Sequence, residues 1–266
     1  MISNMLARIG IGGAKIDTKV EDRLYHPGEI VKGEFEVTGG NVTQTIRQID
    51  LLLCTKVKLD EDISFSSGDE IVILRSPNVA RLEIGANQKV TIPFEVKLPI
   101  ETPLTEWQGT SLRCDLYFKT ELDLEGAIDA LDVDRLRVGP TPEQRRILQA
   151  LVSLGFHFNK AEVELGRVAG STLFFHQEIE FYSSKRYSGK IRDLELTFIA
   201  MDFELEVILE IERNFTDKSG SIRKFGDQII RFKVNPLITD SVHFEHQIDG
   251  LLNSRFSRIT SSDKSF

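Results

Sequence analysis

Strict alternation of apolar and polar residues is the feature that most limits how this chain can fold. Within residues 31–37, every second residue is small or apolar and each residue between them is charged. Successive side chains of a β-strand point to opposite faces of a sheet, so this period of two buries one face and leaves the other in water. The pattern recurs in residues 90–98, 112–124, 194–198 and 204–212. Half-buried strands repeated in this way predict sandwiches of packed β-sheets.

One stretch, residues 48–57, is apolar on both faces instead of one. Leu51, Leu52, Leu53 and Cys54 follow one another there. A continuous apolar run of this length is typical of a strand that is covered from both sides, as at the centre of a sheet. We therefore expect this strand to lie deep in the first sandwich.

The period changes at Thr141, where several signals for the start of a helix come together. Thr141 can cap exposed amides, the proline after it suits the first helical turn, and Gln144 completes the spacing of a capping box. Apolar residues then recur at helical spacing up to Gly155, whose access to positive φ makes it a stop signal. These signals predict a helix over residues 141–154, and similar spacing predicts a C-terminal helix near residues 240–252.

The length of the chain and the position of the first helix suggest two domains. The chain has 266 residues, of which 41% are hydrophobic and 28% charged, so it exceeds the usual size of one domain and can fold around a core. We predict a mainly β protein with two lobes. The N-terminal sandwich would span residues 1–139, and the C-terminal sandwich, with both helices, would span residues 140–266.

The formal net charge of −8 comes mostly from the first half of the chain. Residues 1–139 contain 16 Lys and Arg against 23 Asp and Glu, while residues 140–266 contain 17 against 18. Nucleic acids and anionic lipids are bound through clustered positive charge, so this balance argues against both as partners of the N-terminal half. A partner with a basic or neutral surface fits better.

The chain has no sequence signal for export or for crossing a membrane. No apolar run reaches the roughly 20 residues that a spanning helix needs, and residues 1–13 lack the features of a secretion signal, so we predict a cytoplasmic protein. The apolar side chains of this first segment share one side of a short helix: Ile2, Met5, Leu6 and Ile9. We favour packing on the protein's own domain. The alternative is a peripheral membrane protein that uses residues 1–11 as an amphipathic foot.

Five phrases follow one another in the order in which a known family carries them. They are MLARIGIGGAKIDT (5–18), YHPGEIVKGEFEVTGG (25–40), IPFEVKLPIETPLT (92–105), LRCDLYFKTELDLEGAIDALDVDRLRV (112–138) and YSGKIRDLELTF (187–198). Together they resemble the bacterial sporulation-control proteins, which belong to the arrestin-like clan. The resemblance covers most of the chain. It implies a pair of arrestin-like β-sandwich lobes, a regulatory role in entry into sporulation, and no catalytic residues to carry over.

Sandwich lobes leave exposed sheet edges, to which an extended segment of a partner can add through main-chain hydrogen bonds. Near the predicted boundary, six carboxylates precede the first base, Arg135: Glu121, Asp123, Glu125, Asp129, Asp132 and Asp134. This stretch either docks a basic partner or, as we favour, forms a solvated strand and loop. Trp107, the only tryptophan, either packs at the end of a sandwich, which we favour, or anchors a partner.

Residues that carry chemistry are too scattered to define an active site. Cys54 and Cys114 lie in strand-like stretches, and we interpret them as reduced core thiols rather than a disulfide. His243 and His246 stand three apart on the predicted last helix, but a metal site needs further ligands. We interpret the remaining histidines as structural: His26, His157 and His176.

Two other segments resemble chemical motifs without their essential residues. Residues 10–13 are glycine-rich but have no lysine and follow no strand, so they predict a flexible joint rather than a phosphate loop. Residues 60–62 are acidic and flank a turn-forming stretch, which is typical of a solvated hairpin tip. We therefore predict a non-enzymatic regulatory adaptor that binds cytoplasmic proteins and needs no cofactor or metal. A homo-oligomer is compatible with these features, and an enzyme with its site between the lobes is the remaining alternative.

Overall fold

The computed structural model describes residues 12–57, 69–126, 129–187, 190–201, 204–216 and 222–257. The chain divides into two compact units, which we call unit 1 (Met1–Gly139) and unit 2 (Pro140–Phe266). The predicted amphipathic foot at residues 1–11 and the predicted acidic hairpin tip at residues 60–62 lie outside the described residues.

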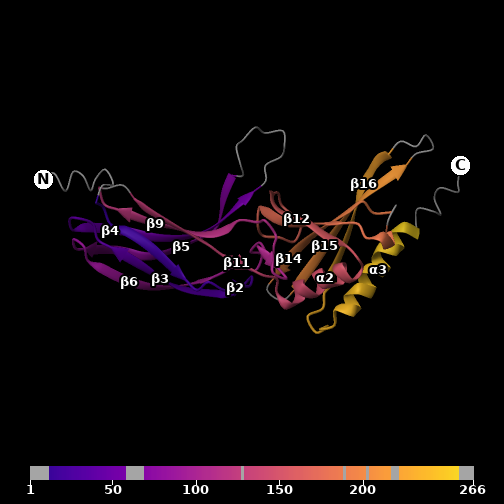
Figure 1. The fold of residues 1–266 in the computed structure, drawn as a ribbon, viewed down its shortest axis with the longest axis horizontal. Helices are drawn as coiled ribbons and strands as arrows, with labels where there is room; N and C mark the ends of the chain where they lie inside the picture. Colours follow the sequence, from indigo (N-terminus) through magenta and orange to yellow (C-terminus); the bar gives the residue numbers. More distant parts are fainter. Residues whose placement is uncertain are drawn as a thin grey trace. The chain divides into compact units, whose positions relative to one another are not determined.

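Unit 1 is built on two antiparallel sheets (Figure 1). The first has the order β1 (Lys15–Val20), β3 (Ile30–Thr38), β6 (Lys89–Lys97). The second has the order β10 (Ala130–Arg135), β9 (Leu116–Leu124), β4 (Gln44–Val57), β5 (Asp69–Ile84). Two short pairs complete the unit: β2 (Leu24–Tyr25) runs parallel to β11 (Arg137–Val138), and β7 (Glu106–Trp107) forms a hairpin with β8 (Thr110–Ser111).

Three phenylalanines join the two sheets of unit 1 into a sandwich. Phe35 of β3 and Phe94 of β6 stack with their ring centroids 4.5 Å apart, and the ring of Phe118 from β9 meets Phe94 edge-on at 6.5 Å. All three side chains are buried. Offset and edge-on contacts are the favoured arrangements of aromatic rings, so this trio is a firm link between the layers.

The double-sided apolar run of the sequence forms the central strand of the second sheet. Strand β4 lies between β9 and β5, and Leu51, Leu52, Leu53 and Cys54 are all buried. Neighbouring residues of a strand face opposite ways, so both faces of β4 are covered at this point. The prediction of a deep central strand is confirmed.

Gly33 is held in the middle of β3 by neighbours that leave no room for a side chain. A Cβ built at this position would lie 2.5 Å from the carbonyl oxygen of Lys19 and 2.5 Å from Cζ of Phe94. The Lys19 oxygen belongs to the backbone of the adjacent strand and cannot turn aside. The Phe94 ring is part of the aromatic link described above, so its freedom to move is small.

We expect the substitution Gly33→Ala to lower the free energy of unfolding of unit 1 by about 1–3 kcal/mol, the usual cost of overpacking a core. Urea denaturation followed by the fluorescence of Trp107 measures this change, since the only tryptophan lies in unit 1. Gly250→Ala is the matched control. A Cβ at Gly250 meets nothing within 4 Å inside helix α3 (Ser241–Ser257). We expect Gly250→Ala to leave the Trp107 transition of unit 1 unchanged and to gain about 0.5–1 kcal/mol in unit 2, followed by circular dichroism at 222 nm. Wild-type stability in Gly33→Ala would contradict the prediction.

Unit 2 contains one five-stranded antiparallel sheet among its described residues. Its strands are neighbours in sequence order: β12 (His157–Leu165), β13 (Phe175–Tyr182), β14 (Asp193–Met201), β15 (Glu204–Thr216) and β16 (Ile222–Val234). Helices α2 (Pro142–Ser153) and α3 contact each other and lie along the sheet (Figure 1). A short 3-10 helix, η1, spans Lys185–Tyr187.

The helices cover the apolar face of this sheet. The buried side chains of that face include Ile179, Phe181, Leu194, Leu196, Val207, Leu209 and Ile211. The buried side chains of the helices include Ile147, Leu148, Leu151, Phe244, Ile248 and Leu252. The second layer of unit 2 is therefore helical in the described part of the chain. Alternation specifies that a sheet face is apolar, but helices and a second sheet bury such a face equally well.

Both helices occur where the sequence predicts them. Helix α2 begins with the expected capping box, in which Thr141 accepts a hydrogen bond from the Gln144 amide while the Gln144 side chain accepts one from the Thr141 amide. It ends before Gly155, which has a φ of 85°. The Asp240 carboxylate accepts a hydrogen bond from the amide of Val242, and α3 begins next to it. The predicted mainly β fold with a mid-chain and a C-terminal helix is confirmed.

Candidate functional site

Strand β10 stands at one edge of the second sheet of unit 1, where it pairs with β9. Its apolar side chains face water and its acidic side chains face inward, which is the opposite of the usual arrangement. Leu131 and Val133 point outward and are 60% and 56% exposed, whereas Asp132 and Asp134 lie opposite the buried Thr120 and Phe118 of β9. We call this strand, with its two exposed apolar and two inward carboxylate side chains, the β10 edge.

Asp132 reaches from the β10 edge to the opposite sheet. One of its carboxylate oxygens accepts a hydrogen bond of 2.6 Å from the backbone amide of Thr18, in edge strand β1. Next to this contact, the hydroxyl groups of Thr18 and Thr120 share a hydrogen bond of 2.6 Å between the sheets. Inward charges on edge strands are one way in which β-proteins limit indiscriminate edge-to-edge pairing.

Asp134 is the carboxylate of the pair whose surroundings disfavour its charged form. Its oxygen Oδ2 is buried without a hydrogen-bond partner among the described residues. Burial, followed by the neighbouring Asp132 carboxylate, raises the pKa of Asp134 to about 6. Both effects disfavour the charged form, because a buried carboxylate loses its water and repels a second carboxylate beside it.

The raised pKa of Asp134 predicts a pH-dependent stability. The folded state binds this proton more tightly than the unfolded chain, so the stability that the protonated form contributes is complete below pH 3.8 and is lost as the pH rises through about 6. Asp134→Asn keeps a neutral side chain at every pH. We expect the variant to match the wild type near pH 4 and to be more stable by about 1–2 kcal/mol at pH 7, after allowance for partial exposure.

Thermal and urea unfolding at pH 4 and at pH 7, followed by Trp107 fluorescence, compare the two proteins. Asp22→Asn is the control, because the Asp22 side chain is exposed in unit 1 and pairs with Arg137. We expect its effect to stay within about 0.5–1 kcal/mol at both pH values. A destabilised Asp134→Asn variant at pH 7 would contradict the prediction.

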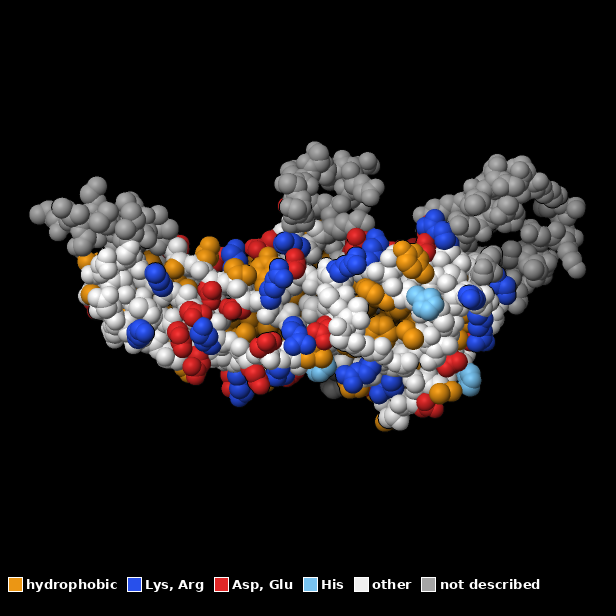
Figure 2. Space-filling view, in the orientation of Figure 1, with side chains coloured by type: hydrophobic (Ala, Val, Ile, Leu, Met, Phe, Trp, Pro, Cys, Tyr) orange, Lys and Arg blue, Asp and Glu red, His pale blue; other side chains and the backbone are white. Residues whose placement is uncertain are grey.

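The other carboxylates of the acidic stretch have partners within unit 1. Glu121 lies 3.6 Å from both Arg75 and Lys119, Asp123 accepts hydrogen bonds from Arg47, and Glu125 accepts one from Arg81 at 3.1 Å. Asp129 accepts a hydrogen bond of 3.0 Å from the Leu124 amide. The structure thus divides the six carboxylates between two faces. On the face that Figure 2 shows, acidic and basic side chains are interspersed.

Trp107 lies inside unit 1, in the small hairpin of β7 and β8. Only 7% of its surface is exposed, and its indole N–H is buried without a hydrogen-bond partner among the described residues. A ring in this position contributes its area to the core of unit 1.

The cysteines and most histidines take up structural positions. Cys54 and Cys114 are free thiols, and burial raises the pKa of Cys54 to about 11, which keeps it an unreactive thiol at neutral pH. The His26 ring bonds the Gly139 carbonyl oxygen at 3.1 Å. His243 and His246 are exposed on α3. His176, by contrast, lies beside two glutamates on the sheet of unit 2, at 2.9 Å from one of them.

The chain is similar to known proteins both in its sequence and in its fold. The family described as "SpoOM protein" matches residues 2–215. The chain belongs to the Spo0M family. The sporulation-control protein spo0M of Bacillus subtilis (strain 168) is 32% identical over 255 residues, which cover 94% of this chain and 96% of that protein. The crystal structure of Spo0M from Bacillus subtilis superposes with a TM-score of 0.79 at 30% identity, over 92% of this chain and 99% of that one.

Membership of the Spo0M family agrees with the resemblance seen in the sequence. Within the described residues, no helix is long and apolar enough to cross a membrane. Leu131 and Val133 were not singled out from the sequence, although their alternation with aspartates is visible in residues 130–135. Sequence patterns are usually interpreted with the apolar residues facing the core. This interpretation fails for β10, in which the aspartates face inward and the apolar residues face water.

Proposed function

We propose that this protein regulates sporulation in the cytoplasm by binding another protein, not by catalysing a reaction. The family relationship supports the sporulation role, since the related Bacillus protein is named for sporulation control. The observation that carries the binding role is the β10 edge, where Leu131 and Val133 stand exposed on a strand that pairs on one side only.

The β10 edge suits an extended segment that adds to the sheet as a further strand. Main-chain hydrogen bonds would hold such a segment, and every second side chain would lie beside Leu131 and Val133. The side chains between them would face the side of Asp132 and Asp134. A segment that alternates apolar and basic residues fits both, because a basic group would pair with the Asp134 carboxylate and lower its electrostatic cost.

Site-specific photo-crosslinking in the native host tests this binding mode. A photoreactive residue replaces Leu131 or Val133, and a control carries it at Leu237, which is 86% exposed in unit 2. We expect a discrete partner to be cross-linked from positions 131 and 133 and to be absent from position 237. Equal products from all three positions would contradict a site at the β10 edge. Cross-links only to a second copy of the chain would replace the proposal by self-association.

Complementation tests the regulatory role separately. A strain that lacks this protein receives the wild type, Leu131→Lys with Val133→Lys, or Leu237→Lys, and its spores are counted. We expect the wild type and Leu237→Lys to restore the normal spore count and the double variant to fail at normal protein levels. A deletion strain that forms spores normally would contradict the sporulation role, while full rescue by the double variant would contradict the edge as its site.

A further inference from the structure

The face of the unit 2 sheet opposite the helices is rich in carboxylates. Glu180, Glu195 and Glu210 lie in one row across strands β13, β14 and β15. Like charges in directly opposed positions repel each other. Burial, followed by the carboxylates of Glu178, Glu210, Glu180 and Glu164, raises the pKa of Glu195 to about 7. Lys160 pairs with Glu180 at 3.4 Å and partly neutralises this row, but the carboxylates around Glu195 still favour its uncharged form.

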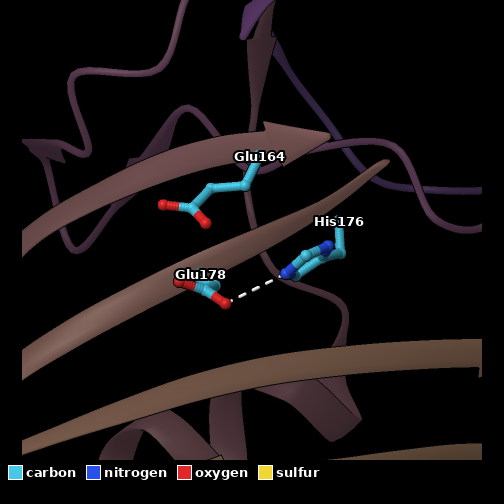
Figure 3. A group of neighbouring side chains, drawn as sticks. All are labelled: Glu164, His176 and Glu178. Carbon is cyan, nitrogen blue, oxygen red and sulfur yellow. Dashed lines mark hydrogen bonds and ion pairs between the residues drawn. The ribbon is translucent and has the colours of Figure 1, made fainter. Parts of the chain in front are cut away.

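Next to this row, a histidine joins two glutamates at the loop end of the β12–β13 hairpin (Figure 3). Glu164 of β12 and His176 of β13 are directly opposed, and Glu178 follows two residues after His176 on the same face. The Nε2 atom of His176 lies 2.9 Å from Oε1 of Glu178. One ligand atom from each of the three residues lies within 4.8 Å of the others.

We propose that Glu164, His176 and Glu178 bind a divalent transition-metal ion, with Zn²⁺ as the representative. An imidazole nitrogen with two carboxylates is a donor set typical of such ions, whereas Mg²⁺ and Ca²⁺ prefer oxygen ligands alone. Three protein ligands leave further coordination positions for water or for a group of a partner. The partly exposed side chains leave the ion a path from solvent.

Binding requires a small contraction of the cluster. Zn²⁺ bonds to nitrogen and oxygen are about 2.0–2.2 Å long, so tetrahedral ligand atoms end about 3.3 Å apart. His176 Nε2 and Glu178 Oε1, at 2.9 Å, already lie within this spacing, so the contraction concerns Glu164. Rotation about the side-chain torsions of Glu164 brings in the third ligand without a backbone shift, because its last torsion is soft.

The surroundings of His176 orient its ring for this role. Its second nitrogen, Nδ1, is buried beside the backbone of Gly166, and no residue in the described part of the chain gives it a hydrogen bond of normal geometry. The ring therefore presents Nε2 to the two carboxylates while its other edge faces the backbone. In metal-binding histidines the second nitrogen commonly donates to a backbone or carboxylate group, and the backbone of Gly166 is the group on that side of His176. A bound ion would join the edge strand β12 to β13 where residues 166–174 leave the sheet.

Titration of the full-length protein with Zn²⁺, after removal of metal with EDTA, tests the site. Calorimetry at pH 7.5 gives the stoichiometry and the affinity, and Mg²⁺ is titrated in parallel. We expect one Zn²⁺ per chain and no comparable binding of Mg²⁺. The changes His176→Gln and Glu164→Gln are each expected to weaken Zn²⁺ binding at least tenfold, about the lower loss measured when even an outer partner of a metal site is removed.

The double variant His243→Gln with His246→Gln is the matched control, because it removes two exposed histidines on α3 and leaves the cluster intact. We expect its affinity for Zn²⁺ to equal that of the wild type. Circular dichroism in EDTA shows that each variant keeps its fold, and two conservative variants are used so that the test does not depend on one. Stoichiometric binding that survives His176→Gln and Glu164→Gln, binding lost in the α3 control, or no binding of Zn²⁺ would each overturn the proposal.

Discussion

Phe118→Ala is expected to lower the free energy of unfolding of unit 1 by about 3–5 kcal/mol, the range for removal of a buried aromatic side chain. Phe118 is buried, and its ring supplies the contact from the second sheet to Phe94 in the first. The substitution removes the apolar contact and leaves a cavity between two sheets that cannot close fully, because each is held by its own hydrogen bonds. Urea denaturation followed by Trp107 fluorescence measures the loss in unit 1.

Two variants show whether the loss comes from the aromatic link. Phe118→Leu keeps most of the volume, so we expect it to lose clearly less than Phe118→Ala. Leu131→Ala removes an exposed side chain of the neighbouring strand, so its stability should stay within about 0.5 kcal/mol of the wild type. If Phe118→Ala unfolds at the same urea concentration as Leu131→Ala, the aromatic trio does not hold the two layers together.

Tyr187→Ala is expected to destabilise unit 2 by about 3–5 kcal/mol, by analogy with other buried aromatic residues. The Tyr187 ring is buried and stacks on Phe156 at a centroid distance of 5.2 Å. Its hydroxyl group donates a 2.5 Å hydrogen bond to the Asp249 carboxylate and so ties η1 to helix α3. Burial and this bond raise the pKa of Tyr187, which keeps the hydroxyl protonated as a donor.

Tyr187→Phe separates the hydrogen bond from the packing. It keeps the stacked ring and leaves Asp249 with Arg186 and Asn253, so we expect a loss of about 1–3 kcal/mol, typical of a hydrogen bond to a charged group. Circular dichroism at 222 nm follows unit 2, since both α-helices of the described residues belong to it. Equal stabilities of the wild type and Tyr187→Phe would show that α3 is held by packing alone.

Local patterns in the sequence predicted those features whose causes are local. Alternation in residues 31–37 and the double-sided run at Leu51–Cys54 correspond to strands β3 and β4. Thr141, Gln144 and Gly155 mark the ends of α2 because caps and stop signals act over a few residues. These signals depend on contacts near in the chain, so a single sequence is enough to recognise them.

The two candidate sites depend on contacts between distant residues. The sequence places Asp132 and Asp134 in an acidic stretch, but only the pairing of β10 with β9 shows that they face inward and that Leu131 and Val133 face water. In the sequence His176 is followed by Glu178 and Glu180, whereas Glu164 reaches it only through the register of β12 against β13.

By itself, the sequence determined the period of each segment and hence the mainly β fold. It also determined both ends of α2, the start of α3 and the kinship with sporulation-control proteins. The tertiary structure decided which strands are neighbours, which face of β10 meets water, and that helices rather than a second sheet cover the described sheet of unit 2. The physical reason is that alternation divides a strand into two faces without labelling them. The register of each strand, and the element that covers each sheet face, are set only when segments distant in the sequence bury their apolar faces against each other.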